Sequence, residues 1–384
     1  MRASLASPNS SRAREQGAIL IMVLLIVALV SALSIKFASQ YQLGLARAES
    51  RWHGAQARAF LLGTEEVTKL LFPTADFDPK TDYLGEPWSN EVPIEDEGVT
   101  GSAKLVDATA KLNLNDITRA LDPAKPLSTP DRYSEQQRRF IRLLQTFPDF
   151  PLRPDEAAAL LEAVVDWADD NDVESGQGGA ESNYYMGMPE PYMAANAPFK
   201  SMDELRLIRG FNEMPLLVTL LLPYLTVLPF PDVGLNINTL TLESPNWALQ
   251  PDDGRYRDPA QNINNLWLCI NGVSEMEPLN PMDAQRLIAE RPETGFSDTG
   301  AITDTWNRLF SGRPLDITGL NVKTDYFWLE SSVQLVDQRR SMRSLLWRGA
   351  AQGDVFSTGL KVIQRDDMFE LPTVVQPKKD KKRK

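Results

Sequence analysis

Residues 14–37 read REQGAILIMVLLIVALVSALSIKF, and this stretch decides the layout of the chain. The run from Ala18 to Ile35 carries no charge and would span roughly 27 Å as a helix, close to the ~30 Å hydrocarbon core of a bilayer. A secretory signal has its small-residue cleavage site after the apolar run, but here the only good processing junction, Gly17 to Ala18, precedes it. Cleavage at this junction would remove the leader and keep the membrane helix.

Charges before the apolar run predict its orientation. Arg2, Arg12 and Arg14 precede it against one acid, Glu15. Because basic residues stay on the cytoplasmic side, the N-terminus is expected in the cytoplasm and the bulk of the chain is expected to be exported. An ordinary signal anchor that happens to follow a glycine is the alternative interpretation of this segment.

The layout resembles the prepilins of type IV pili and type II secretion pseudopili. In those families a dedicated prepilin peptidase cleaves after the glycine and methylates the new N-terminus, which implies cleavage after Gly17 and methylation of Ala18. Ordinary members have Glu at the fifth residue after the cut, where this chain has Met22. A carboxylate in a bilayer costs about 2.5 to 3.5 kcal/mol and is retained only beside a charged partner. The minor pseudopilin K of type II secretion is the familiar member that lacks this Glu.

The composition is that of a large, acidic protein. The 384 residues are 42% hydrophobic, and 52 acids against 40 bases give a net charge of −12, which argues against a general nucleic-acid binder. The basic tail Lys378–Lys384 is interpreted as a solvated end. Cys269 is the only cysteine, so no intrachain disulfide forms, and it is expected to be buried. His53 is the only histidine and cannot make a histidine metal site or a triad by itself.

A long spine helix is predicted after the membrane run. No proline occurs between the neighbourhood of Ser11 and Pro73, which allows one helix of about 55 residues and about 80 Å. An apolar stripe recurs at spacings of three and four along its second part, and we expect this stripe to face a globular head. Its members are Ala48, Trp52, Ala55, Ala59 and Leu62.

Strand-like sequence occurs at both ends of the head, with helical sequence between. The region from Glu91 to Asp116 is strand-like and predicts a first hairpin, with apolar and polar residues alternating in GSAKLVDATAKLNLND. Tyr326–Val336 and Ser341–Arg348 predict a second hairpin. Four segments between them have helix-forming composition and N-terminal signals. These are SEQQRRFIRLLQTF, RPDEAAALLEAVVDWAD, SMDELRLIRGF and PLLVTLLLPYL.

The K pseudopilins are known for this layout, and their recurring motifs are present. KLNLND, DWADDND, GGAESNYY, DELRLIRGF and GLNINT all occur in the chain. The resemblance implies an α+β, pilin-like fold with a long N-terminal transmembrane and spine helix, a small antiparallel sheet and a large inserted α-helical domain. The expected divisions are a leader at 1–17, the spine at 18–72 with 18–35 transmembrane, the first part of the head at 73–116, the insertion at 117–315, the C-terminal β part at 316–350 and a tail at 351–384.

An acidic cluster follows the predicted helix RPDEAAALLEAVVDWA. Five acids occur in the nine residues from Asp166 to Glu174, at a helix end that favours cations. Oxygen ligands in a loop suit Ca²⁺ rather than a transition metal, although the spacing is not that of an EF-hand. The K family is known to bind calcium in this insertion. We expect ligands from Asp169, Asn171, Asp172 and Glu181, with Asp166 behind them or at the helix end; a solvated acidic loop is the alternative.

Two other classes of function compete with assembly. MDELRLIRGFNE resembles a helix-hairpin-helix module that grips nucleic-acid phosphates through Arg206, Arg209 and Gly210, and NPMDAQRLIAERPETGF is a similar unit with Arg286 and Arg291. Both are interpreted as packing units, because the insertion is acidic and phosphate binding needs a basic field. The sequence has no HExxH, GxSxG, P-loop or histidine-bearing triad, so no enzyme is expected.

The predicted function is therefore that of a minor pseudopilin in the inner membrane, with its body in the periplasm and its position at the tip of a type II secretion pseudopilus. The partners that the resemblance implies are the small I- and J-type minor pseudopilins and the prepilin peptidase. Secreted substrates and the outer-membrane channel are further expected contacts, and nucleic acid is not one. A minor pilin that primes a type IV pilus is the alternative.

Overall fold

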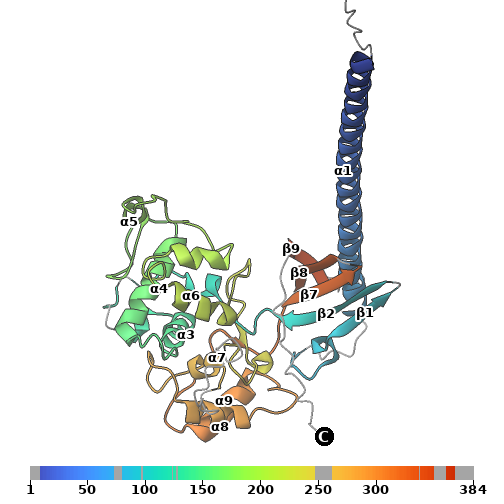
Figure 1. Cartoon of the computed structure of the whole chain (residues 1–384). Helices are drawn as coiled ribbons and strands as arrows, with labels where there is room; N and C mark the ends of the chain where they lie inside the picture. The colour runs from blue at the N-terminus through green and yellow to red at the C-terminus, as the bar shows by residue number, and fades with distance from the viewer. Residues whose placement is uncertain are drawn as a thin grey trace, which may run out of the picture.

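The structure is a computed structural model. It describes residues 9–72, 80–96, 98–122, 124–126, 129–246, 262–336, 338–349 and 360–367, and for residues 9–18 only the helical course of the backbone. Figure 1 shows a long helix that stands clear of the rest, a sheet at the foot of this helix and a helical body beside the sheet. This arrangement is the predicted α+β, pilin-like fold with an inserted helical domain.

The described elements follow one another as a helix, a sheet, a helical body and a return to the sheet. The α-helices are α1 (Asn9–Leu71), α2 (Leu114–Ile117), α3 (Glu135–Leu144), α4 (Pro154–Ala168), α5 (Ser182–Met186), α6 (Pro215–Leu221), α7 (Asn265–Cys269), α8 (Pro281–Ala289) and α9 (Thr299–Leu309). The strands are β1 (Val92–Asp96), β2 (Val99–Asp107), β3 (Leu112–Asn113), β4 (Leu225–Thr226), β5 (Leu235–Asn236), β6 (Leu320–Asn321), β7 (Tyr326–Leu335), β8 (Gln338–Arg348) and β9 (Leu360–Asp367).

Helix α1 confirms the prediction of a single unbroken spine, which runs for 63 residues. From Ile19 onward it is long and apolar enough to cross a membrane, and none of its apolar window is buried in the protein. These properties fit a single-pass membrane anchor. Met22 is exposed on this helix. The predicted cleavage junction of Gly17 and Ala18 lies outside the residues whose side chains the structure describes.

The face of α1 that packs on the sheet is not the predicted one. Ala57, Leu61 and Glu65 are buried, and their spacing of four places them on one side of the helix. Of the predicted stripe, Leu62 is half-buried and packs on the core, whereas Trp52 is 65% exposed and Ala48, Ala55 and Ala59 are also exposed. The prediction was wrong because the buried face includes a charged residue. Arg365 of β9 donates to Glu65 at 2.7 and 2.9 Å, which makes that burial possible.

One antiparallel sheet forms the head, in the order β1-β2-β7-β8-β9. The predicted C-terminal hairpin is confirmed as β7 and β8. The first hairpin, predicted within Glu91–Asp116, is confirmed as β1 and β2, and it ends at Asp107. Strand β9 lies in the segment that we expected to be a tail, 351–384. Most of its side chains are exposed and polar, so its sequence lacks the apolar alternation that marks a strand.

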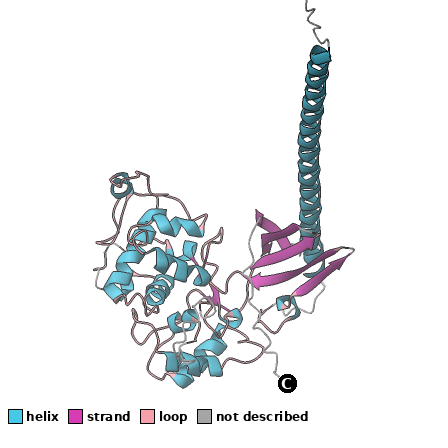
Figure 2. Ribbon diagram, viewed as in Figure 1, coloured by secondary structure: helices cyan, strands magenta, loops and turns pink. Residues whose placement is uncertain are grey.

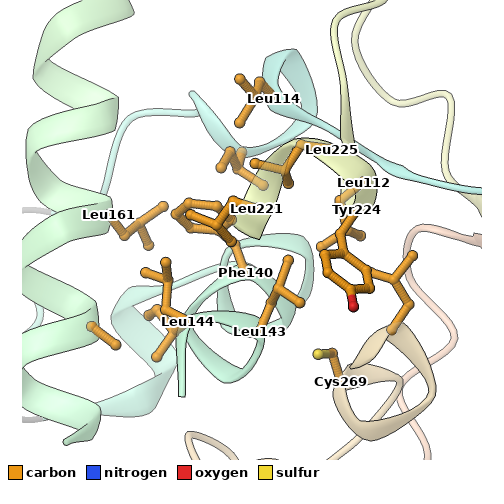
Figure 3. Close-up of a cluster of buried hydrophobic side chains, with 14 of the residues drawn as sticks. Leu112, Leu114, Phe140, Leu143, Leu144, Leu161, Leu221, Tyr224, Leu225 and Cys269 are labelled. Atoms are coloured by element: carbon orange, nitrogen blue, oxygen red, sulfur yellow. The ribbon is translucent and has the colours of Figure 1, made fainter. Parts of the chain in front are cut away.

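The helical body occupies the sequence between β2 and β7, and Figure 2 shows it beside the sheet. Its core begins at Leu112 and includes Val322, so the insertion is longer at both ends than the predicted 117–315. Figure 3 shows part of this core, in which Phe140 of α3 lies among leucines and Cys269 is buried nearby, as predicted.

Most of the predicted helical segments of the insertion are confirmed. Helices α3 and α4 form where expected, and the capping box at Ser134 starts α3. Helix α6 covers the first part of PLLVTLLLPYL. The segment SMDELRLIRGF instead contains a 3-10 helix, Met202–Leu207.

The insertion contains the same hydrogen-bonded unit twice. In KLNLND, the side-chain amide of Asn115 accepts from Phe199 N at 2.8 Å and donates to Phe199 O at 3.1 Å. In GLNINT, the amide of Asn238 accepts from Phe296 N at 2.7 Å and donates to Phe296 O at 3.0 Å. Each buried Asn therefore ties its own motif to a distant loop of the insertion. The two similar motifs share this structural role.

Candidate functional site

The acidic loop leaves the end of α4 and then lies back against that helix. A Cβ on Gly178 would come within 2.2 Å of the Ala159 backbone, and a Cβ on Gly179 within 2.2 Å of the Asp166 carboxylate. Only glycine permits so close an approach. The glycine run therefore brings the following residues over the end of α4, where Asp166 is fully buried, and it positions Glu181 there.

Three acids meet at this crossing. Ligand oxygens of Asp166, Asp169 and Glu181 lie within 4.8 Å of one another. Asp166 accepts hydrogen bonds from Ser175 N at 3.0 and 3.2 Å. Among the described residues, both carboxylate oxygens of Glu181 are buried without a hydrogen-bond donor, and the residue is only 2% exposed. A buried carboxylate without donors requires a proton or a cation.

Burial and mutual repulsion raise the pKa values of all three acids. Burial raises the pKa of Asp166 to about 6. Burial, together with the charges of Asp166 and Asp169, raises the pKa of Glu181 to about 7. The pKa of Asp169 is also raised, first by burial and then by the charges of Asp170 and Asp172. The site therefore concentrates more negative charge than its surroundings stabilise. Its carboxylate oxygens are ligands that suit a hard cation such as Ca²⁺.

The other predicted ligands lie on the exposed side of the loop. Asn171 and Asp172 are exposed, and the side-chain oxygen of Asn171 accepts from Val173 N at 2.8 Å. Neither belongs to the group of three acids. Asp166, which we expected behind the ligands, is one of the three. The path of the loop decides which acids meet, and the glycine run before Glu181 was the sequence signal for that path.

Arg209 and Arg291, one from each segment that resembles a helix-hairpin-helix module, bind groups within the protein. Arg209 donates to Gly179 O at 2.8 Å and lies over the ring of Tyr184, 5.0 Å from its centroid. Arg291 donates to Leu240 O at 2.8 Å. Because these guanidinium groups bind carbonyls and rings of the insertion, they support the packing interpretation over phosphate binding. Arg209 also holds the glycine run in place beside the acidic site.

A spine helix packed on an antiparallel sheet, with a helical body inserted between two of its strands, defines a pilin-like protein with an inserted domain. The family model for type II secretion system (T2SS) protein K matches residues 110–230, the first half of the insertion. The type II secretion system protein K of Aeromonas hydrophila is 28% identical over 340 residues, which cover 88% of this chain and 94% of that protein. The protein K of Klebsiella pneumoniae is 29% identical over 369 residues, which cover 92% and 96%.

The fold also matches a solved structure, the GspK-GspI-GspJ complex of the enterotoxigenic Escherichia coli type 2 secretion system. One chain of it superposes with a TM-score of 0.62 at 20% identity, covering 84% of this chain and all of that one. The chain is thus similar over most of its length to protein K of type II secretion systems, and this similarity supports the role of a minor pseudopilin.

Proposed function

We propose that this minor pseudopilin acts without catalysis at the tip of the periplasmic pseudopilus, where it helps to initiate assembly and so supports protein export. The observation that carries the proposal is the position of the insertion, which lies beside the sheet and makes the head far wider than the helix that carries it (Figure 1). Such a head would collide with its neighbours if it were repeated along a shaft. At the tip it has free space.

Met22 supports the same position. If the intramembrane Glu of an ordinary subunit pairs with the terminal amine of the subunit ahead, a subunit with Met22 offers no charge to a predecessor. It needs none if it is first. Its own amine at Ala18 can still pair with the Glu of the subunit behind. We therefore propose anchoring in the inner membrane, with the N-terminus cytoplasmic and the head periplasmic.

The proposed partners follow from the solved relative, which is a complex of GspK with GspI and GspJ. Small I- and J-type minor pseudopilins would bind through the spine helix and the head. The prepilin peptidase would process the leader, and secreted substrates or the outer-membrane channel would contact the exposed insertion.

Immunogold labelling and quantitative mass spectrometry of isolated pseudopili test this position. The expected result is labelling at one end only, and Met22→Glu should fold normally without any gain in assembly. Recovery of the chain at regular intervals along the filament, in amounts comparable to the major subunit, would exclude the tip.

We also propose that Asp166, Asp169 and Glu181 hold a structural Ca²⁺, with Asn171 and Asp172 as further ligands from the same loop. The buried carboxylate of Glu181 without donors supports this proposal. Bound Ca²⁺ would offset much of the negative charge of the cluster and fix the loop on α4. Chelation should lower the melting temperature, and a melting curve indifferent to chelator and to added Ca²⁺ would leave a solvated acidic loop.

A further inference from the structure

A long apolar groove runs between α1 and the β1 edge of the sheet. Its volume is about 750 Å³, and its walls include Gly63 and Val67 of α1, Trp88 before β1, Ile94 of β1 and Leu105 of β2. The hydroxyls of the threonines in its α1 wall donate to carbonyls of their own helix, at 2.9 Å for Thr64 and 2.8 Å for Thr68. The groove therefore favours an apolar occupant over a polar one.

The groove exists because α1 is held to one side of the sheet. On the β9 side, Arg365 binds Glu65, and Arg58 binds Asp367 at 3.0 Å. The buried positions of α1 contact β7 and β8 in the middle of the sheet. Toward β1, the same helix leaves Gly63 and Val67 exposed above the sheet.

The shape of the groove favours a helix as its occupant. Ala59, Gly63 and Val67 follow one another at a spacing of four, so they form one row along α1. A Cβ on Gly63 would meet no atom within 4 Å, which leaves room for close approach of another helix. An added strand is disfavoured, because Pro93 in the middle of β1 removes a backbone donor from that edge. Acyl chains are excluded by distance, since Ala59 lies about 36 Å along α1 from the end of the apolar run at Ile35.

We infer that this groove seats the periplasmic half of the spine helix of a second pilin-like subunit, lying parallel to α1. The inference rests on the proposed function and specifies its assembly surface. A spine anchored in the same membrane with the same orientation must approach along α1. The exposed stripe of Ala48, Trp52 and Ala55 leads from the membrane side directly to Ala59 at the mouth of the groove.

Gly63→Leu tests the groove in the full chain, co-expressed with the other subunits of its secretion system and purified from detergent-solubilised membranes. The leucine should fill the groove without harming α1, because its site is open and leucine is a better helix former than glycine. Co-purifying pilin-like subunits should fall at least tenfold while the melting temperature does not fall. Ser50→Leu is the control: Ser50 is exposed on the side of the same helix opposite Ala59, about 20 Å nearer the membrane than Gly63, and this variant should retain the partners.

The possible results distinguish a failure of the groove assignment from a failure of the proposed function. Undiminished partners with Gly63→Leu, or equal loss with Ser50→Leu, would overturn the assignment of the groove as the binding site. A wild-type chain that recovers no pilin-like subunit would overturn the proposed function itself. The occupant is identified with Gly63→Cys carrying a benzophenone, a clean label because the native Cys269 is buried. Ile363→Cys on β9 is its control. The expected crosslink is to the N-terminal helix of another subunit, and a crosslink to lipid, to this chain itself or to a globular head would contradict the inference.

Discussion

Asp107 and Asn236 lie 129 residues apart in the sequence, and the side-chain amide of Asn236 donates to Asp107 Oδ2 at 2.9 Å. Thr239 donates to the same oxygen at 2.6 Å, and the backbone and hydroxyl of Thr109 both donate to Oδ1 at 2.7 Å. Asp107 is the last residue of β2, whereas Asn236 belongs to the insertion. One buried carboxylate with four donors therefore fastens the insertion to the sheet.

Asp107→Asn should weaken this junction. An amide in place of the carboxylate would turn an NH₂ group toward donors, so at least one buried donor would lose its acceptor, at a cost of about 2 kcal/mol or more. Thr239→Val removes only one hydrogen bond and should cost about 1 kcal/mol. Thermal unfolding of the detergent-solubilised chain measures both. Equal stability of Asp107→Asn and wild type would contradict the role of this carboxylate.

Glu181→Gln should separate the effects of charge and calcium. Without Ca²⁺ the variant should be at least as stable as wild type, because one of three crowded acids loses its charge. With Ca²⁺ at a hundredfold excess over Kd, the wild type should gain about 2.7 kcal/mol and the variant much less. Differential scanning fluorimetry with Ca²⁺ or chelator checks this. Asp170→Asn is the control, since it removes an exposed acid of the same loop that lies outside the group of three, and it should keep the calcium response. A variant that responds to Ca²⁺ like wild type would exclude Glu181 as a ligand.

The same acids predict a pH dependence of the calcium-free protein. The pKa values of about 6 for Asp166 and about 7 for Glu181 lie above those of an unfolded chain, about 3.9 and 4.3. The folded state therefore holds more protons between about pH 4 and pH 7, and stability is lost as the pH rises through this window. The melting temperature in BAPTA should fall from pH 5 to pH 8, and saturating Ca²⁺ should remove the trend. A melting temperature that rises over this range would show that other groups dominate.

Processing is a separate test at the other end of the molecule. Co-expression with a prepilin peptidase should give a mature chain that begins with methylated Ala18, and Gly17→Leu should block the cut. Intact-mass spectrometry distinguishes the two products. A mature N-terminus beyond Ile35 would mean an ordinary signal peptide.

The sequence predicted the elements whose signals are local. The proline-free run gave α1, and alternation gave the hairpin of β7 and β8. The orientation of α1 could not be predicted, because the buried face includes Glu65, whose counter-charge Arg365 comes from the far end of the chain. Strand β9 was missed for a related reason, since it is an edge strand with mainly polar exposed residues.

The candidate site was predicted as a region but not as a geometry. Composition located the acids between Asp166 and Glu181, and the helix end before them was also found. Spacing could not show that Asp166 joins the cluster while Asn171 points its oxygen to the backbone of its own loop. That outcome depends on the close packing of Gly178 and Gly179 on α4, which is a tertiary contact.

The pairing of Glu65 with Arg365 also orders the events by which the protein is made, since 300 residues separate the two. Synthesis proceeds from the N-terminus, so α1 reaches the bilayer long before β9 exists. The insertion has its own core between β2 and β7 and can close in the meantime. The sheet is completed last, when β9 is synthesised and Arg365 pairs with Glu65 on α1. A chain cut short before β9 would thus leave Glu65 without its counter-charge and the sheet without its edge strand.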